Sequence, residues 1–300
     1  MLQLAYHQAV PLEHLRGPAL NQILNLVDGA TLKIRGPLFM RGSEEDPVRI
    51  NVSAAPDYRG AGAWGGIIVS QSERRSRIQH AVLAGSGDQN LANRQDYYGI
   101  TGCLSFYESD VDIIDSEFVD MHCEDALNIV RSEFSISATT IQNPRADGFD
   151  SDFSRGILRG SRFLNTGNDA VDVSGTELTL RDVRFHNIGD KAVSVGEESV
   201  LDASGLDIDV SSTGVASKDR SSASISDSMF ANIYGSGLIT YIKKSEYGSA
   251  AIDCRNCTFT NTGYIATNQR GSEIRIDGVS QPVTNFEQAH LVEAGFVSGQ

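Results

Sequence analysis

The chain has 300 residues, 40% of them hydrophobic, which is enough for one large domain or two small ones. It carries 25 basic and 39 acidic side chains, and the net charge of −14 argues against nucleic acid or an anionic membrane surface as an electrostatically held partner. No stretch approaches the roughly 20 apolar residues of a membrane span, so we expect none.

Residues 1–30 indicate an N-terminal cap rather than a signal peptide, because they lack a basic start followed by an apolar core. Leu20, Ile23, Leu24 and Val27 would share one face of a helix, so we predict an amphipathic helical cap. The missing secretion signal fits a cytoplasmic protein, or a piece of a larger protein with flanking domains.

A repeat dominates the middle of the chain. "GNDAVDVSG" begins at Gly167 and "GDKAVSVGE" begins 22 residues later, at Gly189. Related phrases begin at Glu124, Ala146, Ser212 and Gly235. Alternating runs such as "LTLRDVRF", punctuated by Gly and Asn, are typical of strands and turns. With no room for a helix, the repeat predicts an all-β coil with about 22 residues per rung.

Two further columns recur with nearly the same step. The polar column consists of Asn143, Asn165, Asn187, Asp209 and Asn232. The apolar column consists of Phe118, Ile141, Phe163, Phe185 and Phe230. Asn tolerates the left-handed conformation of a tight turn, and its amide can bond its neighbours on rungs about 4.8 Å away. The polar column therefore predicts a structural ladder.

The asparagine column, the 22-residue step and the phrase "WGGIIV" from Trp64 resemble the right-handed parallel β-helix of the pectate-lyase superfamily, over roughly residues 30–265. The resemblance implies a single right-handed parallel β-helix at residues 31–270, after the cap at 1–30 and before a C-terminal strand or cap at 271–300. We expect loops at 85–98 and in "KKSEYGS", and expect "FEQAHLVEAGF" to cover the last rung.

One outer face of this coil concentrates charge. Alternate side chains of a strand point in opposite directions, so Asp172 points outward if Val171 and Val173 point inward. The same parity and the adjoining turns expose Asp147, Asp150, Asp152, Asp169 and Asp172, followed by Lys191, Lys218, Lys243 and Lys244. Stacked like charges are unfavourable unless they are paired or bound to a cation. The face is therefore a candidate for recognition or chemistry, with ordinary surface ion pairs as the alternative.

Four phrases resemble polygalacturonase-like glycoside hydrolases, in the same order along the chain: "ADGFD", "GNDAVDV", "GDKAVSVGE" and "GVASKD". Asp147, Asp169 and Lys218 match that family's polar positions, whereas Asn168, Lys191 and Ala216 depart from them. An inverting hydrolase needs an acid and a base flanking the bond, and the resemblance implies these roles for Asp147 and Asp169.

A uronate lyase or epimerase is the other catalytic hypothesis. It would use Lys191, Lys218 or Lys243 as a base or as a clamp on the substrate carboxylate. Together the two hypotheses make Asp147, Asp169, Asp172, Lys191 and Lys218 the candidate catalytic residues.

The same face supplies candidate ligand-binding residues. Those for a substrate are Asp150, Asp152, Glu197, Tyr241, Lys243, Lys244 and Tyr247, with the two tyrosines expected to be exposed. No cofactor is required, but Asp150, Asp152 and Asp172 are candidate Ca²⁺ ligands, since Ca²⁺ prefers carboxylate oxygens.

Cysteines stand at positions 103, 123, 254 and 257. The single C-x-x-C phrase lacks a second pair, so it does not form a convincing metal site. We expect small buried or half-buried cysteines, with a disulfide as the alternative.

The phrases "DSDFS", "ASKD" and "YIKKSEYG" resemble β-helix modules of bacterial surface proteins, over about Asp147 to Tyr247. This resemblance implies an extracellular or cell-envelope module. Our leading hypothesis is a module that binds a polysaccharide, which could be acidic, along the charged face. The alternative is a polysaccharide-cleaving or epimerising enzyme, and the third hypothesis is a structural stalk.

Overall fold

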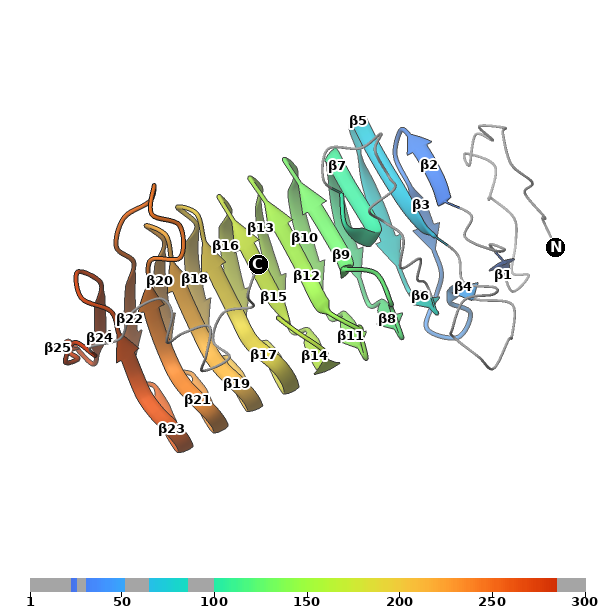
Figure 1. The fold of residues 1–300 in the computed structure, drawn as a ribbon. Coiled ribbons are helices and arrows are strands. Elements are labelled where there is room, and N and C mark those ends of the chain that lie inside the picture. Colours follow the sequence, from blue (N-terminus) through green and yellow to red (C-terminus); the bar gives the residue numbers. More distant parts are fainter. Residues whose placement is uncertain (1–22, 26–30, 52–64, 86–99, 285–300) are drawn as a thin grey trace.

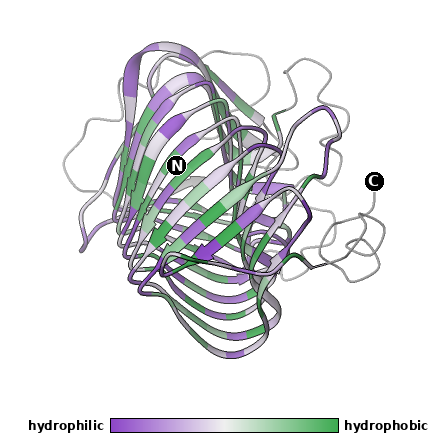
Figure 2. Ribbon diagram, turned by 90° about the vertical axis from the view of Figure 1, so that its left-hand side faces the viewer, coloured by the Kyte–Doolittle hydropathy of each residue, from purple (hydrophilic) through white to green (hydrophobic). Residues whose placement is uncertain are grey.

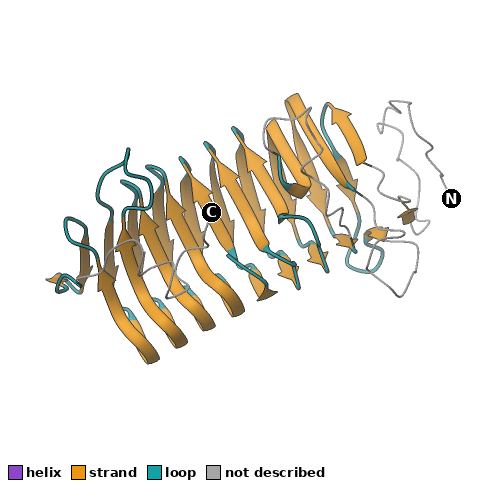
Figure 3. Ribbon diagram, viewed as in Figure 1, coloured by secondary structure: helices purple, strands orange, loops and turns teal. Residues whose placement is uncertain are grey.

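The computed structural model describes residues 23–25, 31–51, 65–85 and 100–284. All regular elements in these ranges are strands, and successive turns of one coil lie side by side along an axis (Figures 1 and 3). Every pairing between turns is parallel, and Asp150 lies between Asn128 and Asp172, each 22 residues away. The described residues contain no helix with the length and apolar character of a membrane span.

The strands form three faces, and the long strands bend from one face into the next. Face 1 contains β2 (Thr31–Arg35), the starts of β5 (Gly66–Gln79) and β7 (Gly102–Ile114), β9 (Asp125–Val130), β12 (Asp147–Asp152), β15 (Val171–Ser174), and the ends of β17 (Arg184–Gly196), β19 (Asp207–Lys218), β21 (Met229–Tyr241) and β23 (Thr258–Asn268).

Faces 2 and 3 complete each turn of the coil. Face 2 contains β3 (Phe39–Arg41), the ends of β5 and β7, β10 (Glu133–Ser137), β13 (Arg155–Arg159), β16 (Glu177–Arg181), β18 (Val200–Ser204), β20 (Ser222–Ser226), β22 (Ala251–Arg255) and β24 (Glu273–Ile276). Face 3 contains β1 (Ile23–Asn25), β4 (Val48–Asn51), β6 (Ala81–Ala84), β8 (Glu117–Val119), β11 (Thr140–Gln142), β14 (Arg162–Thr166), and the starts of β17, β19, β21 and β23.

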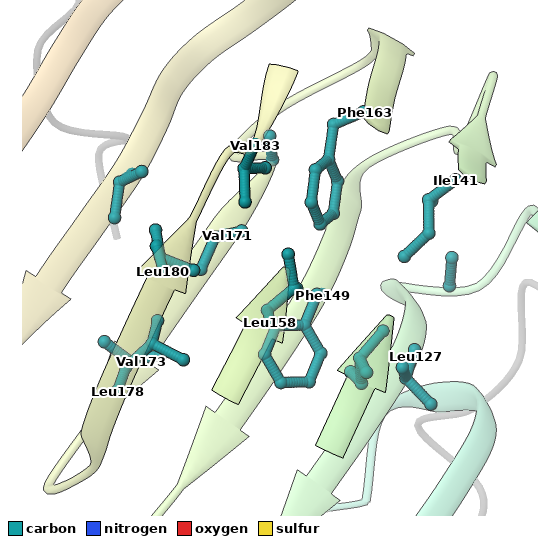
Figure 4. Close-up of a cluster of buried hydrophobic side chains, with 14 of the residues drawn as sticks. Leu127, Ile141, Phe149, Leu158, Phe163, Val171, Val173, Leu178, Leu180 and Val183 are labelled. Carbon is teal, nitrogen blue, oxygen red and sulfur yellow. The ribbon is translucent and has the colours of Figure 1, made fainter. Parts of the chain in front are cut away.

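Apolar side chains from all three faces fill the interior of the coil. Val171 and Val173 point inward and are fully buried, as the alternation predicts. Phe149 from face 1, Leu158 from face 2 and Phe163 from face 3 meet in the core (Figure 4). Because equivalent positions stack, the Phe163 ring lies 5.3 Å from the Phe185 ring of the next turn. Figure 2 shows the successive turns from a view rotated by 90°.

The corner between faces 3 and 1 carries the asparagine column. Asn143, Asn165 and Asn187 have φ angles of 54°, 54° and 58°, in the left-handed region. The Nδ2 of Asn165 donates to Asn143 Oδ1, and the Nδ2 of Asn187 donates to Asn165 Oδ1, each at 2.9 Å. These side chains therefore both form the turn and link consecutive turns.

The expected place of Asp209 in this column was wrong. Register pairs Asp209 with His186, and Val210 takes the left-handed corner with φ of 60°. Asp209 keeps a bridging role, because its Oδ1 accepts a hydrogen bond of 2.7 Å from Asn232 Nδ2.

A column of buried hydroxyl side chains, which the sequence analysis missed, follows the corner between faces 1 and 2. Each backbone N–H donates to the hydroxyl of the next turn, over distances of 3.0–3.1 Å, in the order Ser132, Ser154, Thr176, Ser199 and Ser221. The hydroxyls satisfy backbone groups that would otherwise be buried without a partner. Ser and Thr at this corner are therefore structural.

The two ends of the coil differ from expectation in part. Residues 1–22 of the expected helical cap lie outside the described residues, whereas Ile23–Asn25 forms strand β1, which pairs with β4. At the other end, β24 continues the coil and β25 (Val279–Ser280) pairs with it antiparallel. The described chain has no strand between Tyr241 and Ala251, where the sequence predicted a loop. The expected loop at 85–98 and "FEQAHLVEAGF" lie almost entirely outside the described residues.

The cysteines are buried or half-buried, as expected, and they form disulfides, which was the alternative expectation. Cys103 pairs with Cys123, and Cys254 pairs with Cys257. The first bridge joins β7 to the segment before β9, and these two elements are neighbours on face 1. Sequence spacing did not reveal the first bridge, because Cys103 and Cys123 are 20 residues apart and become neighbours only when the coil forms.

Replacing Thr176 by Val will test the hydroxyl column. The change removes the acceptor of the Ser154 N–H, and an unpaired buried donor costs about 1–3 kcal/mol. We expect the free energy of unfolding in urea to fall by that amount. Thr176→Ser keeps the hydroxyl and is the matched control, with a smaller loss. A Val variant as stable as the Ser variant would show that the column does not stabilise the corner.

Candidate functional site

The outward positions of face 1 form a strip that runs along the axis of the coil. Most of its side chains are polar, and we call it the polar strip. Its central column consists of Asn128, Asp150, Asp172, Ser194, Ala216 and Ile239. Flanking positions add Asp147, Asp169 and Lys191 at the entry to the strands, and Asp152, Lys218 and Tyr241 at their ends. The structure thus brings the five predicted catalytic residues onto one face.

Asp147 and Asp169 link consecutive turns through the backbone. Asp147 Oδ1 accepts hydrogen bonds from the backbone N–H of Asp169, at 2.9 Å, and from Asn168 Nδ2, at 2.6 Å. Asp169 Oδ1 in turn accepts from the backbone N–H of Lys191, at 3.0 Å. Each carboxyl therefore stabilises the turn of the next rung, as well as facing outward.

The acidic part of the strip holds protons more tightly than ordinary aspartates. Burial, reinforced by Asp169 and Asp172, raises the pKa of Asp147 to about 8. Burial, reinforced by Asp172 and Glu197, raises the pKa of Asp152 to about 6. Burial also raises the pKa of Asp150, whose Oδ2 accepts from Asn128 Nδ2 at 2.7 Å. At neutral pH the strip therefore presents carboxylic acids as well as carboxylates.

Lys218 lies across the neighbouring turn because Gly196 leaves room for it. A Cβ atom at Gly196 would come within 2.7 Å of the Lys218 side chain. The Lys218 Nζ donates to Ser194 Oγ at 2.8 Å and lies 3.7 Å from Asp172 Oδ1. Burial would lower the pKa of Lys218, but Asp172 outweighs it and raises that pKa. Burial opposes ionisation of Asp172, yet Lys218 and Ser194 lower its pKa, so both groups stay charged.

Lys191 is the second buried lysine, and only 5% of its surface is exposed. Its Nζ lies 3.3 Å from Asp169 Oδ1 and also contacts Asp190. Burial would lower the pKa of Lys191, but these two carboxylates raise it, so the side chain stays protonated. Burial raises the pKa of Asp169 to about 6, with Lys191 opposing the shift.

The predicted ligand-binding residues at the edge of the strip form a second set of contacts. Glu197 accepts from Ser174 Oγ, and its Oε1 lies 2.6 Å from Lys244 Nζ. The backbone N–H groups of Lys243 and Lys244 donate to Asp219 Oδ1 at 2.7 and 2.8 Å. These bonds hold the start of the 242–250 loop beside the lysine end of the strip.

The structure corrects the expected aromatic residues. Tyr241 is only 1% exposed, because it packs among the side chains of the strip, and Tyr247 is half-buried in the 242–250 loop. Among the described residues, the exposed aromatic side chains are instead Tyr234, Tyr264 and Phe153, at 76%, 65% and 62%. Tyr264 pairs with Ser236 and lies on β23, beyond the end of the strip. Sequence reasoning missed these residues because it does not show which strand positions other segments cover.

The calcium hypothesis gains no support from this geometry. Within the described ranges, no three His, Cys, Asp or Glu side chains are placed to hold a metal ion. Asp150 bonds Asn128, and Asp172 faces Lys218, so two of the three expected ligands already have other partners. A Ca²⁺ site on Asp150, Asp152 and Asp172 stays a prediction.

The fold described above places the chain in the class of parallel β-helix proteins. The family described as "Right handed beta helix region" matches residues 125–280. This match covers more than half of the 300 residues, and the chain belongs to that right-handed β-helix family. The predicted right-handed parallel β-helix of pectate-lyase type is thus confirmed.

Solved structures agree with this assignment. The chain is similar to the periplasmic alginate epimerase AlgG, with a TM-score of 0.54 and 12% identity over 85% of this chain and 72% of that one. It is also similar to the enzymatically active domain of bacteriophage CBA120 tailspike protein 2, with a TM-score of 0.51 and 8% identity over 86% of this chain and 48% of that one. At these identities the similarity concerns the fold alone. No curated protein sequence matches the chain.

The raised pKa of Asp147 predicts how stability depends on pH. An unfolded aspartate ionises near pH 4, whereas folded Asp147 ionises near pH 8, so the folded state holds an extra proton between these values. Stability from this proton is complete below about pH 4 and is lost as pH rises through about 8. Asp147→Asn keeps the Oδ1 acceptor and removes the titration, so its melting temperature relative to wild type should rise between pH 4.5 and pH 8.5.

Circular dichroism melts across this pH range are the measurement. Glu117→Gln, which removes an exposed carboxylate of β8, is the matched control and should leave the slope unchanged. Parallel curves for wild type and Asp147→Asn would contradict the assigned protonation.

Proposed function

We propose that the chain is an extracytoplasmic module that binds a polysaccharide along the polar strip. The observation that carries this proposal is the run of polar side chains from Asn128 through Asp150 and Asp172 to Ser194, on successive turns about 4.8 Å apart. A linear polymer lying along the axis would follow this run from one turn to the next. Solenoid proteins bind extended ligands along such repeated surfaces.

The chemistry of the strip suits sugar hydroxyls. At neutral pH, protonated Asp147 offers an O–H donor, and the ammonium group of Lys244, whose side chain is 42% exposed, offers N–H donors at the edge of the strip. Ionised Asp172, whose side chain is 27% exposed, offers acceptors. Donors and acceptors thus alternate over short distances, and charge-assisted hydrogen bonds of this kind are strong. An exposed Tyr264 adds a ring on which a sugar can stack.

Two independent features support the extracytoplasmic part of the proposal. The described chain contains two disulfides, and disulfides persist mainly in oxidising compartments. The fold is also that of a protein named as a periplasmic alginate epimerase. We expect the native protein, unfolded without reductant, to react with no thiol reagent. Four reactive thiols would contradict this location.

Catalysis is the second candidate, and one observation favours it. Asp147 and Asp169 are joined through a backbone hydrogen bond, and their pKa values of about 8 and about 6 are those of an acid and a base at neutral pH. In glycoside hydrolysis Asp147 would protonate the leaving oxygen, and Asp169 would take a proton from the attacking water.

Binding is nevertheless the better supported function. Asp169 is only 3% exposed and is paired with Lys191, whereas a general base must reach the water that it deprotonates. The raised pKa values of Lys191 and Lys218 also make both lysines poor bases. A uronate lyase or epimerase would therefore need another base.

Affinity electrophoresis in gels containing polygalacturonate, alginate, galactomannan or β-glucan will test binding, with and without Ca²⁺. We expect at least one polysaccharide to retard the protein. The double variant Asp172→Asn/Lys218→Met removes both charges of a strip ion pair without leaving either unpaired, and should weaken retardation at least tenfold. Arg184→Met/Asp207→Asn removes an ion pair from face 3 and is the matched control.

The same polysaccharides, assayed for new reducing ends and unsaturated uronates, separate binding from catalysis. Product formation that falls at least 100-fold in Asp147→Asn, while retardation persists, would establish an enzyme. Retardation without product supports the binding module. Neither retardation nor product would leave a structural stalk as the function. Retardation that needs Ca²⁺ and is lost in Asp150→Asn would support the calcium site.

A further inference from the structure

Phe153 is an exposed aromatic residue in an unfavourable backbone conformation. It follows Asp152 directly at the corner after β12, its φ is 50°, and 62% of its surface is exposed. Left-handed backbone is uncommon for a bulky side chain, and exposing a large ring forgoes its burial. Arg131 and Gly175 take the same corner on the adjacent turns, so the fold does not require an aromatic residue there.

The neighbouring turns hold the ring in a fixed place. A Cβ atom at Gly175 would lie 2.7 Å from Phe153 Cδ1, so the glycine is what lets the ring lie against the next turn. On the preceding turn, the Arg131 guanidinium carbon lies 5.8 Å from the centre of the Phe153 ring. Arg131 is itself held by the hydroxyl of Tyr107, to which its Nη1 donates at 2.8 Å. The ring is therefore positioned before any ligand arrives.

A shallow groove of about 510 Å³ surrounds the ring, within the size range of small-ligand sites. Its charged lining consists of Arg131, Arg155, Asp110, Glu133 and Glu177. Arg155 Nε lies 2.9 Å from Glu177, and Arg75 Nη2 lies 3.2 Å from Glu133 and 3.6 Å from Asp110, so these charges are paired. Arg131 instead contacts the Tyr107 hydroxyl and the Phe153 ring, and the three arginines together balance the three carboxylates. Paired charges offer hydrogen-bond donors and acceptors without a net attraction for an ion.

We propose that this corner groove is a subsite for one uncharged pyranose ring of a polysaccharide. The apolar C–H face of the sugar packs on Phe153, and its hydroxyls bond Arg155, Glu177 and Glu133. Because Asp152 and Phe153 are consecutive residues, a polymer held on the polar strip can place a side branch or a bent terminus in the groove. The subsite rests on the proposed polysaccharide binding and adds a substrate preference for a glycan with uncharged sugars.

A purely structural role for Phe153 makes a different prediction. Aromatic side chains can protect the exposed backbone of a neighbouring glycine. In that role, Phe153→Ala would lower stability, and would weaken all ligands only in proportion to the fraction unfolded.

Affinity electrophoresis with galactomannan, β-glucan and polygalacturonate distinguishes these roles. We expect Phe153→Ala to weaken the retardation by a neutral polysaccharide at least fivefold, with a melting temperature within about 2 °C of wild type. Phe153→Tyr keeps the ring and should retain binding. Val200→Ala, which removes a side chain that is 50% exposed on face 2, should behave as wild type.

Fluorescence gives a second measurement. The chain has a single Trp, so Phe153→Trp adds a reporter whose emission should shift when galactomannan or β-glucan binds, and Val200→Trp should not respond. Wild-type retardation that Phe153→Ala leaves unchanged would overturn the subsite alone, as would retardation by polygalacturonate only. A wild type retarded by no polysaccharide would overturn both the subsite and the proposed function.

Discussion

The corners of the coil are the constraint on which the rest of the structure depends. Strands on flat faces satisfy their own backbone groups through parallel pairing, but each corner must turn the chain from one face to the next with few residues and no unpaired donors. Asn165 and its stacked neighbours do this with left-handed backbone and side-chain amides. Thr176 and its neighbours do it with buried hydroxyls. Only when both corners repeat in register can apolar residues such as Phe163 and Phe185 stack in the core.

Because the corners hold the backbone and the inward residues form the core, the outward positions of face 1 can differ from turn to turn. Their freedom is limited by electrostatics, since equivalent side chains lie only about 4.8 Å apart. The structure meets this limit in two ways. Asp172 is compensated by the Lys218 ammonium, whereas Asp147 keeps its proton. These two effects limit the repulsion among the stacked aspartates.

The sequence predicted the coil because its signals are local and periodic. The step between Gly167 and Gly189 and the alternation around Val171 follow directly from pairing geometry. It also placed Asp147, Asp169 and Lys218 on one face, since parity decides which side of a strand a residue occupies. Structural features that are built from common residue types could not be predicted. Serines of the hydroxyl column look like any loop serine, because Ser is common at solvated turns.

Other errors came from contacts between distant segments. Asp209 has the spacing of the polar column, but the turn between Gly196 and Val200 contains one extra residue, so the step grows from 22 to 23 and Val210 takes the corner instead. Tyr241 has the outward parity of an exposed platform, yet it is buried against the lysines of earlier turns. Contacts such as those of Tyr241 with the lysines form only where a long side chain can reach an adjacent turn. Lys218 does so because Gly196, on the neighbouring turn, has no side chain in its path.

The order of groups along the strip has a consequence for recognition. Carboxyl groups on β12 and β15 come first, buried lysines on β17 and β19 follow, and the exposed Tyr264 lies beyond them on β23. A strip with different chemistry at its two ends is not equivalent for the two orientations of a polymer. Polysaccharides have a reducing and a non-reducing end, so under the binding proposed above the strip would select the direction of a polymer as well as its composition. A stalk that needed only solubility would gain nothing from such an order, and could have been built with the serines and threonines that its own corners already use.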